Sequence, residues 1–292
     1  MNDDSLEVRQ VTVRFGGLTA LDGVSLTAPP NQVTGIIGPN GAGKTTLLNV
    51  LCGLVRPESG SARFAGRELL RLRPHQLAGL GIARTLQGVG LFGGLSVAEN
   101  VMVGATCHAR AGTWPALLGL LRSDRDERML RARAMAALEL VGVAEHADRM
   151  PGTLPYGVRK RVALARALAS GPRLLLLDEP ASGLSEQELG ELGTLISALA
   201  RDLTLVIIEH RMDLMMSACD SITVLDFGKV IAAGTPGQVQ ADPAVTAAYL
   251  GIAADGGEAG AGAAGAGEGG AGEDGGRPGG PGGPGPAGGG AR

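Results

Sequence analysis

The sequence predicts an α/β fold in which helices flank a mostly parallel sheet and a helical subdomain is inserted between strands. Three observations indicate this. Short apolar runs alternate with helical stretches near the start of the chain and again in its second half, as in strands joined by crossover helices. A helical block over about residues 95–170 interrupts the alternation. Two of the later runs are apolar without a break, which is typical of parallel strands covered on both faces.

The first part of the chain supplies strands and one helix before the helical block. Alternating apolar residues predict a strand over 8–15, and a β-branched run predicts another over 33–37. We expect a helix over 45–54, because Gly53 lies where a helix would end. A short strand over 61–64 follows. The strand at 33–37 therefore leads into the helix through a glycine-rich loop.

The second part of the chain begins with the helical block and returns to strands. Capping boxes, in which a serine precedes a glutamate by three residues, mark two helix starts, one at Ser96 and one at Ser185. The helix after Ser185 is expected to reach about residue 200. The strands of this part are expected over 173–177, 203–208, 221–225 and 229–233. The last two flank a tight turn and form a pair.

Composition separates a folded body from a glycine-rich end. Glycine makes up 19 of the residues in 256–292, a segment with too little apolar surface to form a core. Together with Asp255, this end carries the whole net charge of −3, so the body is neutral and lacks a basic field for nucleic acid or a membrane surface. The content of 2% aromatic residues argues against a base-stacking surface. Three distant cysteines predict neither a disulfide framework nor a zinc site.

The loop after the strand at 33–37 carries a phosphate-binding motif. Residues Gly38-Pro39-Asn40-Gly41-Ala42-Gly43-Lys44-Thr45 match G-x-x-x-x-G-K-[ST] between a predicted strand and a predicted helix. Glycines let the backbone N–H groups turn toward phosphate oxygens, and the helix N-terminus favours the same anion. Lys44 is expected to reach the β- and γ-phosphates, and the Thr45 hydroxyl to bind Mg²⁺. The sequence therefore predicts a nucleotide site.

The nucleotide is predicted to be ATP. Guanine-specific P-loop proteins use an N/T-K-x-D segment, and the three lysines of this chain, at 44, 160 and 229, leave none available.

Two carboxylates follow the apolar run at 173–177. Asp178 and Glu179 come where a buried parallel strand ends, at the sheet edge where phosphates bind. We expect Asp178 to hold Mg²⁺ through water and Glu179 to polarise the attacking water. The alternative is an acidic pair that only caps the next helix. Because the acidic pair occurs in the same chain as the P-loop motif, we favour the catalytic interpretation.

Over about residues 6–252 the chain resembles the ATP-binding subunits of ABC transporters, most closely those of branched-chain amino acid importers. The resemblance rests on GPNGAGKTT (38–46), RTLQ (84–87), ARALA (165–169), LLLLDEPASGL (174–184), IIEHRMDLMM (207–216), FGGLTALDGVSL (15–26) and VLDFGKVIAAGTPGQVQADPAVTAAYLG (224–251). It implies a P-loop NTPase core with an antiparallel β-subdomain, a helical subdomain at about 95–170 and an ATPase domain at 6–252. Residues 253–292 lie outside it, and we expect a disordered Gly/Ala/Pro-rich tail there.

The resemblance assigns roles to matched residues. Phe15 would stack on adenine, Gln87 would contact Mg²⁺ or the attacking water and move with the transmembrane partner, and His210 would contact the γ-phosphate and orient Glu179. Thr46 would complete the phosphate loop. The alternatives without a functional role are a buried strand-end residue for Phe15, a solvated loop residue for Gln87 and a structural histidine for His210.

The signature segment departs from the family pattern. The family reads L-S-G-G-Q or L-S-Y-G-Q, whereas this chain has Leu154-Pro155-Tyr156-Gly157-Val158. Pro155 has neither hydroxyl nor N–H, and Val158 cannot hydrogen-bond. Leu154, Tyr156 and Gly157 would still present a helix N-terminus to nucleotide, less effectively. Ser185 stands near the place of the family's D-loop aspartate. In the family, two ATPase subunits enclose two ATP molecules head to tail, so the altered segment would weaken the site built on the partner's P-loop.

The resemblance also implies partners and a location. It implies transmembrane permease subunits, a second ABC ATPase subunit in a dimer that we expect to be heteromeric, and indirectly an extracytoplasmic solute-binding protein. The chain would sit peripherally on the cytoplasmic face of the cell membrane. The alternatives left open are a regulatory nucleotide-binding subunit with weak hydrolysis and the ATPase of an exporter or lipopolysaccharide system. A soluble ABC ATPase of translation or repair is disfavoured by the single P-loop.

Overall fold

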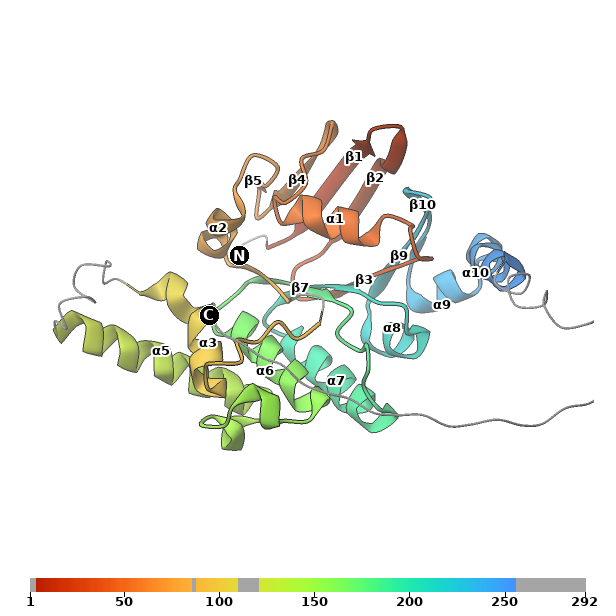
Figure 1. Cartoon of the computed structure of the whole chain (residues 1–292). Coiled ribbons are helices and arrows are strands. Elements are labelled where there is room, and N and C mark those ends of the chain that lie inside the picture. The colour runs from red at the N-terminus through yellow and green to blue at the C-terminus, as the bar shows by residue number, and fades with distance from the viewer. Residues whose placement is uncertain (1–3, 86–87, 110–120, 256–292) are drawn as a thin grey trace, which may run out of the picture.

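The computed structural model describes residues 4–85, 88–109 and 121–255. Figure 1 shows three layers: a small antiparallel sheet with α1 (Lys44–Leu51) on one side, a central sheet, and a layer of helices on the other. The central sheet has the strand order β10-β9-β3-β8-β7-β6. All its neighbours pair in parallel except β9 and β10, which form an antiparallel hairpin. The predicted α/β fold with a mostly parallel sheet is confirmed.

The elements have the following bounds. The central sheet contains β3 (Val33–Ile37), β6 (Ile82–Arg84), β7 (Leu174–Asp178), β8 (Thr204–Ile208), β9 (Ser221–Asp226) and β10 (Lys229–Gly234). The antiparallel sheet, in the order β2-β1-β4-β5, contains β1 (Leu6–Phe15), β2 (Leu18–Ala28), β4 (Ser59–Phe64) and β5 (Arg67–Glu68). The other helices are α2 (Pro74–Leu77), α3 (Val97–Ala105), α5 (Leu121–Leu140), α6 (Tyr156–Leu168), α7 (Glu186–Leu199), α8 (Met212–Ala218), α9 (Pro236–Gln240) and α10 (Pro243–Asp255). Short 3₁₀ turns cover Ala78–Leu80, Thr106–His108, Ala144–His146 and Pro151–Thr153.

The central sheet separates two hydrophobic cores. Along β7, Leu175 and Leu177 belong to the core shared with α3, α5, α6 and α7, whereas Leu174 and Leu176 belong to the core shared with the antiparallel sheet and α1. All four leucines are at most 1% exposed. Because successive side chains of a strand point to opposite faces, an unbroken apolar run is what a strand between two cores requires.

Most element positions agree with the sequence predictions, with differences of a few residues at their ends. Both predicted capping boxes are present, at Ser96 and at Ser185. The first helix stops at Leu51, before Gly53, which adopts a positive φ of 67°. The helix α10 continues through Asp255 and so includes the first three residues of the predicted tail, 253–255. Residues 256–292 lie outside the described part of the chain.

A glycine on α3 sets the distance between two helices of the helical block. A Cβ added to Gly104 would lie 1.8 Å from the backbone oxygen of Arg166 in α6. We expect Gly104→Ala to push α3 from α6 and to destabilise the protein by about 1–3 kcal/mol. Chemical denaturation measures the loss. Gly190→Ala on α7, where no atom lies within 4 Å of the added Cβ, is the matched control and should be neutral or stabilising. Equal effects of the two substitutions would contradict this account.

Within the described residues, no helix combines the length and the apolar character needed to cross a bilayer.

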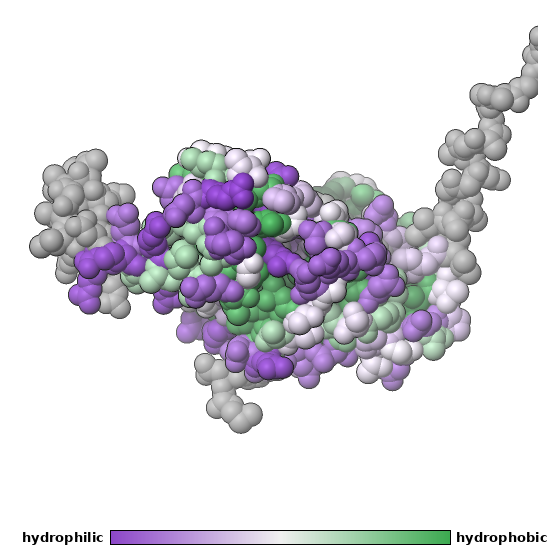
Figure 2. Space-filling model, turned by 90° about the horizontal axis from the view of Figure 1, so that it is seen from below, coloured by the Kyte–Doolittle hydropathy of each residue, from purple (hydrophilic) through white to green (hydrophobic). Residues whose placement is uncertain are grey.

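Hydrophobic residues gather in the middle of the face seen from below, where α3, α6 and α7 lie, and hydrophilic residues border them (Figure 2).

Candidate active site

The predicted phosphate loop connects β3 to α1. Three of its glycines, Gly38, Gly41 and Gly43, have positive φ values of 151°, 82° and 101°. The helix begins at Lys44 behind Gly43, and no side chain caps it. The first N–H groups of α1 are therefore left to a ligand instead of a side-chain cap, and the helix dipole favours an anion at this end.

Lys44 lies inside the loop that it follows. The residue is 9% exposed, and its Nζ donates to the backbone oxygens of Gly38 and Pro39, at 2.7 Å each. Burial lowers the pKa of Lys44, and the charge of Glu179 acts in the opposite direction. This places the loop lysine and the carboxylate after β7 in one electrostatic environment, although they are far apart in the sequence.

Asp178 ends β7 and is held by the neighbouring strand. Asp178 is 3% exposed, and its Oδ2 accepts a hydrogen bond of 2.8 Å from Arg84 of β6. Arg84 also donates to Oδ1 of Asn49 in α1, at 2.8 Å. The Asp178 N–H donates to the hydroxyl of Thr85, at 3.2 Å. Arg84 and Thr85 were quoted above only as part of the RTLQ resemblance, and the structure shows what they contact.

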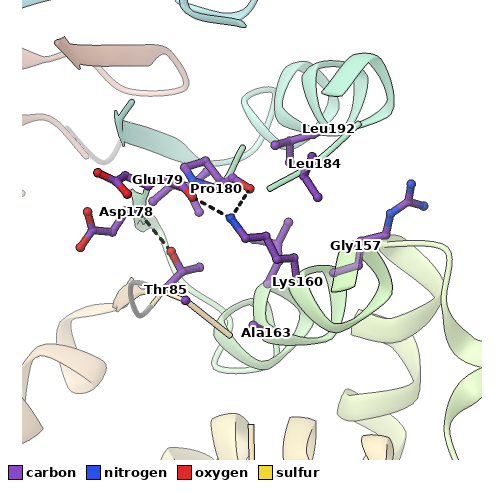
Figure 3. A pocket seen from close by; sticks show the side chains of 13 residues that line it. Thr85, Gly157, Lys160, Ala163, Asp178, Glu179, Pro180, Leu184 and Leu192 are labelled. Atoms are coloured by element: carbon purple, nitrogen blue, oxygen red, sulfur yellow. Dashed lines mark hydrogen bonds between the residues drawn. The ribbon is translucent and has the colours of Figure 1, made fainter. Parts of the chain in front are cut away.

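The turn after β7 is held by contacts from β8 and from α6, and Figure 3 shows the contact from α6. Glu179 adopts a left-handed conformation with φ of 47°, and its N–H donates to Ile208 of β8 at 2.9 Å. The Nζ of Lys160, from α6, donates to the backbone oxygens of Glu179 at 2.8 Å and Pro180 at 3.0 Å. Neither contact was predicted from the sequence.

Glu209, also missed by sequence reasoning, follows β8 and supports the same turn. It is completely buried, and its Oε1 accepts the N–H of Ala181 at 2.5 Å. His210 comes next. Its backbone N–H donates to Glu209 at 3.1 Å, its Nδ1 lies 3.7 Å from the same carboxylate, and its side chain is 55% exposed. The signal for Glu209 was an acidic residue directly after an apolar strand.

The remaining predicted residues lie as follows. Phe15, at the end of β1, is 52% exposed, so it is not the buried strand-end residue considered as the alternative. Thr45 is exposed and Thr46 half-buried, both in the first turn of α1. Gln87 lies outside the described residues.

The signature segment lies before and inside α6. Pro155 is the residue before the helix and provides no side-chain cap. Tyr156 begins the helix. Its ring lies against Gly183, and a Cβ added to Gly183 would lie 2.8 Å from a ring carbon of Tyr156. Leu154 and Gly157 are buried, and Val158 packs against the core. The Val158 side chain is thus used in packing.

The C-terminal helix α10 packs beside α9 and β10. Burial raises the pKa of Tyr249 in α10, and its hydroxyl is buried without a hydrogen-bond partner among the described residues. Tyr249 also packs against the core beside α9 and β10.

Together, the uncapped helix after a glycine-rich loop, the buried lysine and the strand-end carboxylates define a P-loop nucleotide-binding protein. The model of the ABC transporter family matches residues 21–182, and that of branched-chain amino acid ATP-binding cassette transporters matches residues 229–255. The chain belongs to the ABC transporter family, as one of its ATP-binding cassettes, and is an ATPase of that class.

Curated relatives and solved structures agree. The chain is 42% identical over 255 residues to the high-affinity branched-chain amino acid transport ATP-binding protein BraF of Pseudomonas aeruginosa, covering 87% of this chain and 100% of BraF. It is 39% identical to LivG of Escherichia coli K12, with the same coverage. The crystal structure of MJ1267, an ATP-binding cassette of an ABC transporter, in its ADP conformation has a TM-score of 0.73 and 31% identity, and the match covers 84% of this chain and 98% of MJ1267. A nucleotide-free cassette from an ABC transporter gives 0.73 and 30%, with the same coverage.

Proposed function

We propose that this chain hydrolyses ATP to power an importer of branched-chain amino acids or related small polar solutes. The observation that carries the proposal is that the phosphate loop after β3 and the carboxylates after β7 lie at the same edge of the parallel sheet, where Arg84 links α1 to Asp178. The chain also spans the whole of BraF and LivG. The names of both relatives describe branched-chain amino acid transport.

The chain's own residues divide the work of hydrolysis. Glu179 accepts a proton from the attacking water, while Lys44 and the first N–H groups of α1 stabilise negative charge on the phosphate oxygens. Residues 38–46 bind the phosphates, Phe15 stacks on adenine, and His210 contacts the γ-phosphate. Thr45, Asp178 and Gln87 would hold Mg²⁺, which prefers oxygen ligands and supplies charge neutralisation when bound. Thr45 follows the uncapped helix start, and Asp178 ends a buried strand, so the oxygen donors suit that ion.

The partners follow from the same proposal. The chain drives transmembrane permease subunits from the cytoplasmic face of the membrane, in a dimer with a second, different ATPase subunit and with an extracytoplasmic solute-binding protein outside. A groove between β6, α3 and α6 is lined by Phe92 and Val103, which are 52% and 39% exposed, and by Arg166 of α6. This groove suits an apolar segment of the permease. Residues 6–252 form the ATPase domain, with the helical subdomain at about 95–170, and residues 253–292 form a Gly/Ala/Pro-rich tail.

The altered signature segment leads to a prediction. Pro155→Ser restores a hydroxyl and an N–H before α6, at an exposed position where no packing is disturbed. We expect it to raise ATP turnover of the assembled complex, because the site on the partner's P-loop gains hydrogen-bond donors. Val158→Gln is a less suitable test, because Val158 packs against the core. Unchanged turnover in Pro155→Ser would show that this position does not limit hydrolysis.

Transport by a reconstituted complex tests the proposed function. The chain, its neighbouring ATPase subunit, the permease and the binding protein are placed in proteoliposomes, and uptake of labelled leucine is followed with and without ATP. ATP-dependent uptake supports the proposal. Outward movement would favour an exporter. ATP binding without turnover in any assembly would favour a regulatory subunit. Uptake of urea or a short amide instead of leucine would keep the motor role and change the solute.

A further inference from the structure

A lysine of α6, the helix that begins in the signature segment, contacts the turn after β7 that contains Glu179. Lys160 lies one turn after the start of α6, and its stem extends across to the backbone that follows β7 (Figure 3). Its Nζ donates to two successive carbonyl oxygens, those of Glu179 and Pro180, at 2.8 and 3.0 Å. Burial lowers the pKa of Lys160, while the charges of Glu209 and Glu179 act in the opposite direction. Lys160 is therefore a charged group in a partly desolvated place between two segments.

The contacted turn has an uncommon backbone. Glu179 is one of five non-glycine residues with positive φ among the residues that the structure describes, a conformation that L-residues avoid because of their Cβ. It persists where surrounding contacts over-determine it. Those contacts include the bond from the Glu179 N–H to the Ile208 oxygen, the bond from the Ala181 N–H to Glu209, and the two bonds from Lys160. Within the turn, the Ser182 N–H also donates to the Glu179 oxygen at 3.3 Å.

The residue type fits this task. Of the 26 basic residues, three are lysines, so the chain uses arginine for nearly every cation. Both neighbours of Lys160 are arginines, and Arg161 forms an ion pair with Glu191 on α7. An ammonium presents three donors around one point, whereas a guanidinium is a planar fork. Two carbonyls on consecutive residues of a tight turn match the point donor.

We propose that Lys160 is a positioning residue that holds the Glu179 turn in place and links it to the helix beginning with the signature segment. This rests on the proposed function, in which the signature segment contributes to the nucleotide site built on the partner's P-loop. Nucleotide at the partner's site then acts, through one turn of α6 and Lys160, on the water-activating carboxylate of this chain's own site. The two sites of the dimer are coupled within a single subunit by this side chain.

The test compares Lys160→Met with Arg161→Met in the full chain. The first keeps the length and apolar stem and removes the donors, and the second removes the adjacent cation of the same helix without touching the turn. Amide hydrogen exchange is measured over 179–184 in each protein, and ATP turnover in the assembled complex. We expect Lys160→Met to exchange about tenfold faster over this segment and to lower kcat by about 10- to 100-fold, with the KM for ATP unchanged. Arg161→Met should match the wild type in both measurements.

The outcomes are separable. Unchanged exchange over 179–184 in Lys160→Met overturns the proposal, and so does faster exchange with unchanged kcat. If Lys160→Met does not fold, Lys160→Gln, which retains one donor group at shorter reach, gives the same comparison. A wild-type complex without turnover contradicts the proposed function instead, and the exchange data then still decide whether Lys160 holds the turn.

Discussion

Glu179→Gln is expected to lower ATP hydrolysis by the assembled complex by about 10²- to 10⁴-fold, the usual contribution of a general base. Glutamine has nearly the same shape but cannot accept a proton from water. The backbone contacts of residue 179, to Ile208 and Lys160, do not involve the replaced atoms. ATP binding to the isolated chain should therefore remain within a few-fold of the wild type. Turnover of the complex and nucleotide affinity of the chain are the two measurements.

Glu186→Gln is the matched control. Glu186 begins α7, seven residues further on, and its side chain is 80% exposed and paired with Arg211. Exposed pairs contribute little to stability, so this variant should hydrolyse ATP like the wild type. If Glu179→Gln keeps most of the wild-type turnover, then Glu179 is not the group that activates water.

Arg84→Met is expected to cause the largest loss of stability. It leaves the Asp178 carboxylate, whose side chain is 2% exposed, without its cationic partner. Breaking a buried ion pair on one side costs about 3–5 kcal/mol, because the remaining charge stays desolvated. The loss also removes the bond from Arg84 to Asn49 in α1. The free energy of unfolding from denaturant titration measures the effect.

Two further variants test whether the loss in Arg84→Met comes from the buried charge of Asp178. Arg131→Met removes a partner of Asp148 from an ion pair whose side chains are 54% and 87% exposed, and it should cost at most about 1 kcal/mol. Arg84→Met combined with Asp178→Asn should recover part of the loss, because the buried charge is gone. A loss in Arg84→Met no larger than in Arg131→Met would mean that Asp178 is not stabilised by this pair.

The sequence predicted those parts of the fold whose signal is local. The strand β7 is visible in the run of four leucines, and the phosphate loop in its glycines followed by Lys44. The strand β6 is three residues long and is paired on one side only by β7, so its periodicity is too short to recognise. The strand β2 contains Gly23 and pairs with β1 through several irregular register shifts, which obscure its alternation. The helix α8 was not predicted because it has seven residues and no side-chain cap to mark its start.

The candidate site divides in the same way. Lys44, Asp178 and Glu179 were predicted because short motifs place them. The contacts that hold them join residues that are distant in sequence: 19 positions for Lys160 and Glu179, 28 for Ala181 and Glu209, and 94 for Arg84 and Asp178. No periodicity or composition of a single sequence specifies such pairs. The exposure of His210 and the packing of Val158 likewise depend on how the elements meet.

The alternating leucines of β7 also govern how the protein unfolds. Each core draws on the same short strands, so loss of either core removes the packing that supports one face of β7 and β8. The antiparallel sheet and the helical layer are therefore not independent folding units. They belong to one cooperative transition whose most protected amides lie in the central strands.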